Sequence, residues 1–125
     1  MLEPIKFEFK FNSSKKMLYN YIYTPEKMAK WFADYVKSIG SRYICFWNGY
    51  EETFFLIKKK KEKSVRYKWA KFEDKKYYFE FLIQEKLFTK KLDLIITDFV
   101  NKKEIEQSKL WWQNKIKILK QRTEY

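Results

Sequence analysis

The alternation of aromatic and charged side chains is the feature that most constrains the fold of this chain. From Lys6 to Phe11 every second residue is a phenylalanine, and the residues between them are charged. A period of two directs the rings to one face of an extended strand and the charges to the other. The pattern returns in Ser64–Phe72 and in Tyr77–Gln84. These segments predict strands of a sheet that buries one face.

Further strands are expected on both sides of a tight turn. The runs Tyr43–Trp47 and Tyr50–Ile57 flank Asn48-Gly49, a dipeptide that favours the positive φ angles of a two-residue hairpin turn. A last strand is expected over Leu87–Phe99. Two polar segments are expected to be exposed turns, Lys58–Lys63 and Glu73-Asp74-Lys75.

Helices are expected before and after these strands. Asn12-Ser13-Ser14 offers N-cap side chains for a short helix after the first strand. Thr24-Pro25-Glu26 begins a second helix, which the spacing of the apolar residues extends to Ile39, before Gly40. A long final helix is expected from about Lys103 to Gln121, with an apolar stripe along one side.

Strands that are segregated from helices indicate an α+β fold rather than a parallel α/β sheet. The apolar stripe of the final helix must be buried, and one face of the sheet is the broad apolar surface on which it can pack. The 125 residues fit a single domain, expected over 1–125 with a core from about 6 to 121. Because 22% of the residues are aromatic, the composition excludes an intrinsically disordered chain.

Four local motifs occur in a characteristic order. They are Leu18–Phe32 (LYNYIYTPEKMAKWF), Ser64–Trp69 (SVRYKW), Leu94–Phe99 (LIITDF), and the set Trp112, Ile116, Leu119 and Lys120 in the final helix. Together they resemble the START-like (helix-grip, birch-pollen-allergen-like) superfamily over most of the chain. The closest likeness is to short START-like domain proteins of Bacteroidetes type, which are similar to the C-terminal domain of the heat-shock-protein-90 ATPase activator.

This resemblance implies a curved antiparallel sheet wrapped around a long C-terminal helix, with two short helices after the first strand. Members of the superfamily often hold an apolar cavity between sheet and helix. They bind lipids, sterols or polyketides, assist chaperones, or perform cyclase chemistry. Cavity-bearing relatives often have glycine before the helix tryptophan, whereas this chain has Trp111.

The leading functional hypothesis is therefore that a hydrophobic small molecule or lipid binds between the sheet and the final helix. Residues on the inward side of the predicted strands and helix are the candidates to line such a cavity: Tyr67, Trp69, Phe79, Phe81, Leu94, Trp112 and Ile116. The Tyr67 hydroxyl is a candidate to orient the polar end of a ligand. The alternative is that these bulky side chains pack into a filled core.

A filled core would make the protein a non-enzymatic interaction domain, with a second copy or another protein as its partner. Leu110 and Trp111 flank the apolar stripe and are the candidates for an apolar contact. A third alternative, charge-driven nucleic-acid binding, would use Lys59 and Lys60 and the net charge of +12. Nucleic acid is the less favoured partner, because the cations are nearly all lysine rather than arginine.

Several kinds of chemistry are excluded by composition. The chain has no histidine, so it has neither a histidine-dependent catalytic triad nor a histidine-ligated metal. Cys45 is the one cysteine, so no intrachain disulfide forms. We expect no cofactor, no metal and no enzymatic activity, with cyclase-like chemistry as the alternative. The lone cysteine and the lack of a long apolar run favour a cytoplasmic protein.

Overall fold

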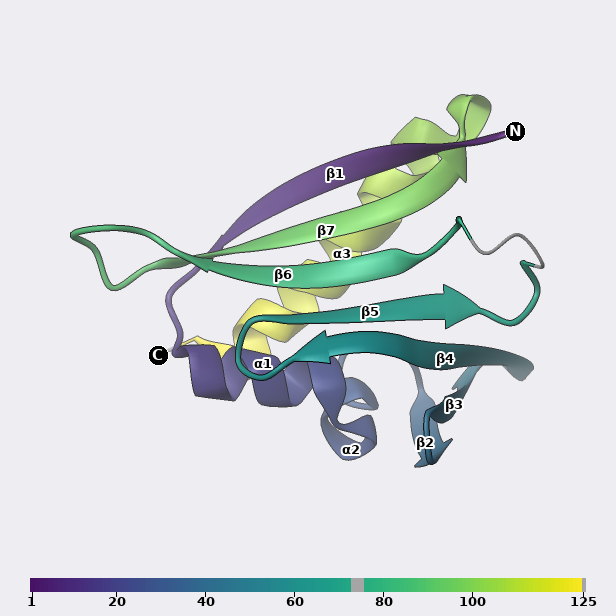
Figure 1. Cartoon of the computed structure of the whole chain (residues 1–125), viewed down its shortest axis with the longest axis horizontal. Coiled ribbons are helices and arrows are strands. Elements are labelled where there is room, and N and C mark those ends of the chain that lie inside the picture. The colour runs from purple at the N-terminus through teal and green to yellow at the C-terminus, as the bar shows by residue number, and fades with distance from the viewer. Residues whose placement is uncertain (73–75, 125) are drawn as a thin grey trace.

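The computed structural model describes residues 1–72 and 76–124, and its frame is one antiparallel sheet of seven strands (Figure 1). The strands are β1 Leu2–Phe11, β2 Tyr35–Ile39, β3 Arg42–Trp47, β4 Tyr50–Lys60, β5 Ser64–Trp69, β6 Phe79–Glu85 and β7 Leu92–Asn101. The helices are α1 Lys15–Tyr23, α2 Pro25–Met28, the 3-10 helix η1 Lys102–Glu104 and α3 Ile105–Thr123. The predicted α+β class, with short helices after the first strand and a long final helix, is confirmed.

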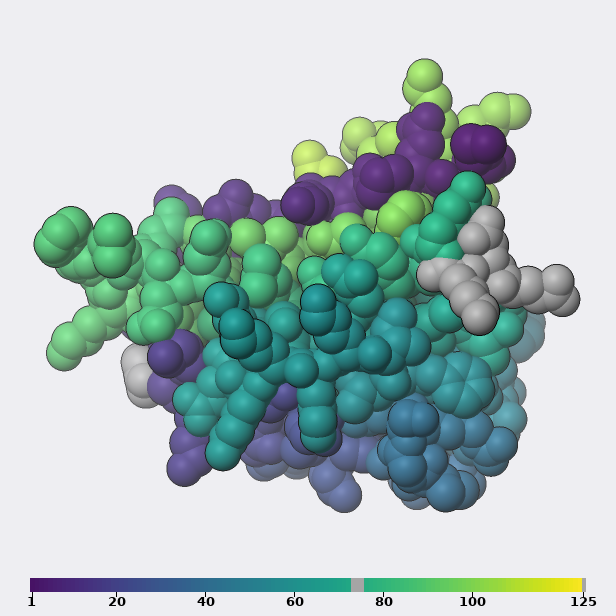
Figure 2. All heavy atoms as spheres, in the orientation of Figure 1, coloured from purple at the N-terminus to yellow at the C-terminus, as the bar shows by residue number. Residues whose placement is uncertain are grey.

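The strands lie in the order β1-β7-β6-β5-β4-β3-β2. Strand β1 pairs with β7 along its whole length, from Leu2 opposite Asn101 to Phe11 opposite Leu92. The sheet curves, and α3 runs diagonally across its rear side in the view of Figure 1. The opposite face, which is turned to the viewer in Figure 2, has no helix over it. The sheet therefore has one face that packs on α3 and one that is directed away from it.

Helix α3 buries the stripe that the sequence predicts. Trp112, Ile116 and Leu119 are 3%, 2% and 0% exposed. Helix α1 adds Leu18 and Ile22, both fully buried. It begins at the predicted cap, where the Ser14 hydroxyl accepts a hydrogen bond of 3.1 Å from the Met17 backbone N–H. These two helices close the inner face of the sheet.

The hairpin between β3 and β4 turns at the predicted dipeptide. Asn48 and Gly49 have φ angles of 46° and 84°, the left-handed values that this turn requires. The lysine-rich turn is shorter than predicted, because Lys58–Lys60 continues strand β4 and the chain reverses at 61–63. Glu62 takes a φ of 58° in that reversal. The turn predicted at Glu73-Asp74-Lys75 lies outside the described residues.

The second predicted helix is wrong beyond its first turns. Helix α2 ends at Met28, a further turn carries the chain to Phe32, and Tyr35–Ile39 is strand β2. Met28 and Phe32 keep helical spacing, which is why the pattern resembled a longer helix. In 35–39, however, the pairing of β2 with β3 supplies the backbone hydrogen bonds. Gly40, with a φ of 61°, turns the chain into β3 rather than ending a helix.

The last strand begins later than predicted. Strand β7 starts at Leu92, whereas Leu87 and Phe88 lie in the exposed connection after β6. These two side chains are 83% and 103% exposed. Their apolar character suggests a strand, but neither side chain is buried.

Candidate functional site

A groove of about 570 Å³ opens between the first half of α3 and the neighbouring ends of the sheet strands. Half of the residues that line it are aromatic: Trp47, Tyr50, Trp69, Phe72, Phe99, Trp111 and Trp112. Thus four of the five tryptophans of the chain meet in one place. Polar side chains at the same groove are Glu52, Lys71, Asp98, Glu104, Gln107 and Ser108. This groove is the candidate functional site.

Two of the tryptophans are held by different strands. Trp47 ends strand β3, and its indole N–H donates a hydrogen bond of 2.6 Å to the Phe32 carbonyl. Trp69 ends strand β5, and its ring stacks on Phe79 with centroids 5.0 Å apart. These contacts fix the orientations of both rings.

Helix α3 contributes the other two rings. Trp111 and Trp112 lie edge to face, with centroids 4.8 Å apart and planes at 89°. Trp112 is buried, whereas Trp111 is 37% exposed and extends to Trp47, with ring centroids 6.0 Å apart. Trp111 therefore extends from the helix to the β3–β4 hairpin. It forms a part of the groove wall that solvent can reach.

The carboxylate of Asp98 lies at the bottom of the groove in contact with Trp112. Its Oδ2 accepts a hydrogen bond of 3.0 Å from the Trp112 indole N–H, and its Oδ1 accepts one of 2.8 Å from the Phe99 backbone N–H. Burial raises the pKa of Asp98, and the Trp112 hydrogen bond partly opposes that rise. Asp98 is therefore a hydrogen-bonding group in a largely aromatic setting.

Sequence reasoning missed Asp98. The alternation of residues in β7 could have indicated it, because Leu94, Ile96 and Asp98 are alternate residues that lie on the same face of the strand. Leu94 and Ile96 are fully buried on that face. A carboxylate on the apolar side of a strand is costly unless it has partners, so it marks a site worth examining.

Lys71 is a cation at the edge of the groove. Its Nζ lies 5.5 Å from the centre of the Trp69 ring and 3.8 Å from Glu52 Oε1. Both contacts are long, and the side chain is 55% exposed. They therefore orient the ammonium group loosely, and surface pairs of this kind contribute little to stability.

The residues predicted to line a cavity divide into two layers. Trp69 and Trp112 line the groove, whereas Tyr67, Phe79, Phe81, Leu94 and Ile116 lie buried behind it. Rings of the inner layer touch one another, with Tyr67–Phe79 centroids 5.2 Å apart and Phe79–Phe81 centroids 6.0 Å apart. The Tyr67 hydroxyl donates a hydrogen bond of 2.7 Å to the Ile22 carbonyl. That hydroxyl is therefore already used in joining the sheet to α1.

The predicted surface residues lie in three different settings. Trp111 lines the groove, and Leu110 beside it is 57% exposed. Lys59 donates a hydrogen bond of 2.9 Å to the Tyr23 hydroxyl, at the other end of the sheet near α1. Lys60 is paired with Ser64 and is exposed. Lys59 and Lys60, although adjacent in the sequence, therefore lie on opposite faces of the sheet.

Two kinds of feature are absent from the described residues, 1–72 and 76–124. No group of three or more His, Cys, Asp or Glu side chains is placed to hold a metal ion there. Within the same residues, no helix is both long and apolar enough to cross a membrane.

Comparison with known proteins gives the same architecture. The family model of the START-like superfamily domain matches residues 1–123. A search of curated proteins finds no significant match. Many solved structures match the fold of this chain, and they come from several organisms.

A Bacteroides fragilis protein solved by solution NMR is 27% identical, with a TM-score of 0.70, over 96% of this chain and 90% of that one. The Aha1 dimer from Colwellia psychrerythraea has a TM-score of 0.82 at 16% identity, over 98% and 96% of the two chains. The Mesorhizobium loti protein MLL2253 has a TM-score of 0.75 at 14% identity, over 95% of each chain. At such low identity, the last two likenesses concern the fold alone.

Proposed function

Because the chain belongs to the START-like superfamily, we propose that it binds a hydrophobic small molecule or lipid in the groove between α3 and the sheet. The observation that carries this proposal is the convergence of four tryptophans on that groove. Aromatic side chains are common in the walls of ligand sites, and about 570 Å³ falls within the usual size of such sites.

The arrangement favours binding over catalysis. The two oxygens of Asp98 accept hydrogen bonds from Trp112 and Phe99, so they serve as fixed acceptors. A ligand would gain most of its affinity from contact with the rings of Trp47, Trp69 and Trp111. Asp98 and Glu104 at the same groove favour a ligand that carries a hydrogen-bond donor rather than an anionic group.

Tryptophan fluorescence tests this proposal, because most of the indoles of the chain lie at the groove. We expect apolar probes to change the emission saturably, and native mass spectrometry to detect any ligand retained from purification. Trp111→Ala should weaken binding about tenfold or more, since it removes a large aromatic contact. Leu110→Ala is the matched control, because Leu110 is adjacent and exposed but does not line the groove. Unchanged binding by Trp111→Ala would refute the proposal.

A second candidate function is self-association through the outer side of α3. Leu110, Trp111 and Ile118 are 57%, 37% and 38% exposed on this helix, and exposed apolar groups mark interaction surfaces. A second copy of the chain is the partner considered, as in the Aha1 dimer from Colwellia psychrerythraea. Here Leu110→Ala should shift the dimer to monomer in native mass spectra. A wild-type protein that is monomeric at high concentration would exclude this function.

A further inference from the structure

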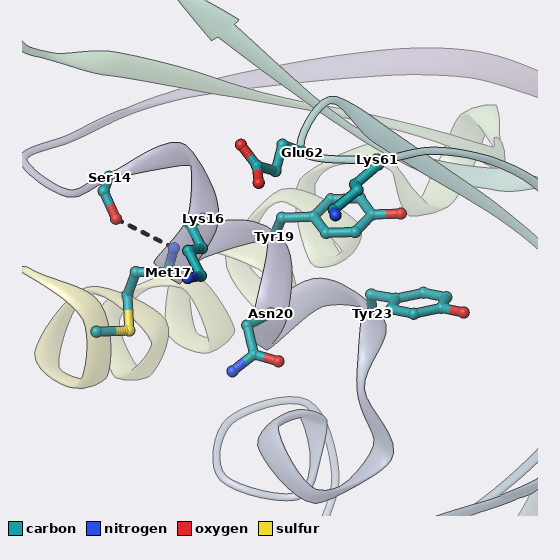
Figure 3. A pocket seen from close by; sticks show the side chains of 8 residues that line it. All are labelled: Ser14, Lys16, Met17, Tyr19, Asn20, Tyr23, Lys61 and Glu62. Atoms are coloured by element: carbon teal, nitrogen blue, oxygen red, sulfur yellow. Dashed lines mark hydrogen bonds between the residues drawn. The ribbon is translucent and has the colours of Figure 1, made fainter.

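A second pocket, of about 560 Å³, lies between α1 and the turn that joins β4 to β5 (Figure 3). Met17, Tyr19 and Tyr23 of α1 form its apolar wall. Lys61 and Glu62 of the turn and Lys16 of the helix stand at its rim. None of the residues that line this pocket lines the tryptophan groove, so the two sites are distinct.

Two tyrosines in this pocket act as a pair. Tyr19 and Tyr23 are four residues apart on α1 and therefore share one side of the helix. Their rings stack with centroids 5.5 Å apart and planes at 20°. Figure 3 shows that both hydroxyl groups are directed to the same side. The helix thus presents two parallel phenols.

Both phenols have a proton to donate. The Tyr23 oxygen accepts a hydrogen bond from the Lys59 ammonium group, which leaves the proton of that hydroxyl available. The Tyr19 hydroxyl has no hydrogen-bond partner among residues 1–72 and 76–124. Burial raises the pKa of Tyr19, so this phenol stays protonated at neutral pH. Two neutral donors therefore lie beside one cation.

The register of β4 and β5 explains how Lys59, which does not itself line the pocket, comes to lie beside Tyr23. Lys59 lies opposite Val65, which is fully buried, so both side chains are on the inner face of the sheet. From there its Nζ lies 2.9 Å from the Tyr23 hydroxyl and 5.0 Å from the centre of the Tyr23 ring. The hydrogen bond to Tyr23 raises the pKa of Lys59, so the group remains a cation. Lys60 is on the opposite face of the same strand.

We propose that this pocket binds an amphipathic anion, a carboxylate or phosphate carried on an apolar chain or ring. The hydroxyls of Tyr19 and Tyr23 and the ammonium group of Lys59 hold the oxyanion. The apolar part of the ligand packs on the stacked rings of Tyr19 and Tyr23. Lys16 and Lys61 at the rim outnumber Glu62, so the local field also attracts an anion. Charge-assisted hydrogen bonds to an oxyanion are stronger than those between neutral groups.

The test is an NMR titration of the full chain with octanoate and with octyl phosphate. We expect saturable shifts of the backbone amides of Tyr19, Tyr23 and Lys59. Lys59→Gln and Tyr23→Phe should each weaken binding about tenfold, since each removes one contact to the oxyanion. Lys60→Gln is the matched control for charge, and Tyr35→Phe, at an exposed tyrosine that lines neither pocket, is the control for a lost phenol. Both controls should bind as the wild type does.

Other outcomes would overturn the proposal. Absence of saturation in the wild type, or equal loss in Lys59→Gln and Lys60→Gln, would leave no specific site. Equal affinity for neutral octanol would show that no oxyanion is recognised, and equal affinity for inorganic phosphate would show that the apolar wall is not used. Trp111→Ala should leave this titration unchanged, because Trp111 lines the tryptophan groove and does not line the pocket beside α1. A negative result for anion binding beside α1 can thus be distinguished from a negative result for ligand binding in the groove.

Discussion

The indole N–H of Trp112 donates a hydrogen bond of 3.0 Å to Oδ2 of Asp98, which joins α3 to β7 at the bottom of the tryptophan groove. The indole is 3% exposed, so water competes little for either group. This contact therefore joins the helix to the sheet and also opposes the rise that burial causes in the pKa of Asp98.

Replacing the Trp112 indole should change both the free energy of unfolding and the pKa of Asp98. In Trp112→Phe an aromatic ring remains but Asp98 loses one partner, which should cost about 1–3 kcal/mol in the free energy of unfolding. The pKa of Asp98 should rise further, since the Trp112 hydrogen bond lowers it. Urea unfolding measures the first effect, and carboxyl NMR measures the second. A carboxyl titration that does not move would contradict this account.

Lowering the pH should raise the contribution of Asp98 to the free energy of unfolding. Because burial raises the folded-state pKa of Asp98 above its ordinary value, the protonated form is favoured in the native state. Its contribution to stability is complete below the unfolded pKa and is lost as the pH rises through the folded one. The pH dependence of unfolding should flatten over that window in Asp98→Asn. An unchanged slope would mean that Asp98 titrates normally.

Alkali should unfold the protein through its buried phenols. Burial raises the pKa of Tyr43 to about 12, and it also raises that of Tyr67. The stability that these neutral phenols contribute is complete below about pH 10, the unfolded pKa, and is lost as the pH rises toward 12. For Tyr43 the loss is on the order of 2 kcal/mol.

Thermal unfolding as a function of pH tests the alkaline effect. Tyr43→Phe should reduce its slope above about pH 10. Tyr50→Phe is the control, because Tyr50 is 76% exposed. Equal slopes in these two variants would rule out the buried phenols as the cause.

Cys45 should resist thiol reagents in the native state. Its side chain is fully buried, and burial raises the pKa of the thiol to about 12. At pH 8 roughly one thiol in ten thousand is then ionised. We expect a disulfide reagent to label Cys45 at the rate of unfolding, independent of reagent concentration. Rapid labelling that is proportional to the reagent would show that the thiol is accessible.

The β3–β4 turn should tolerate few replacements of Gly49. Its φ is 84°, and an added Cβ meets no atom within 4 Å, so backbone strain is the main cost. Gly49→Ala should lower the free energy of unfolding by about 1 kcal/mol. Gly49→Asn should lower it less, because asparagine adopts left-handed angles more easily. The reverse ranking in denaturant melts would point to a side-chain clash instead.

The elements that the sequence predicts well are those in which local pattern and burial agree. Val65 and Tyr67 alternate as predicted and are fully buried, and Asn48-Gly49 forms the predicted turn. Tyr35 and Ile39 misled the prediction because their spacing fits a helix, while pairing with β3 decides their conformation. Local pattern cannot reveal such long-range competition.

The candidate sites are less visible in the sequence for a related reason. Trp47 and Trp111 are far apart along the chain, and only the packing of α3 on the sheet brings their rings within 6.0 Å. Likewise, Lys59 and Lys60 look equivalent in a lysine run, but the strand places them on opposite faces. A single bulge near Ile57 contributes to that register, and sequence alone gives no sign of it.

The pairing of β1 with β7 has a consequence for biosynthesis. Strand β1, which is rich in phenylalanine, is synthesised before β2–β6, and its sheet neighbour β7 is synthesised after them. Until β7 emerges, the edge and the apolar side of β1 stay open to incorrect partners. The nascent chain therefore depends on late, non-local closure, which is slow and favours chaperone protection during translation.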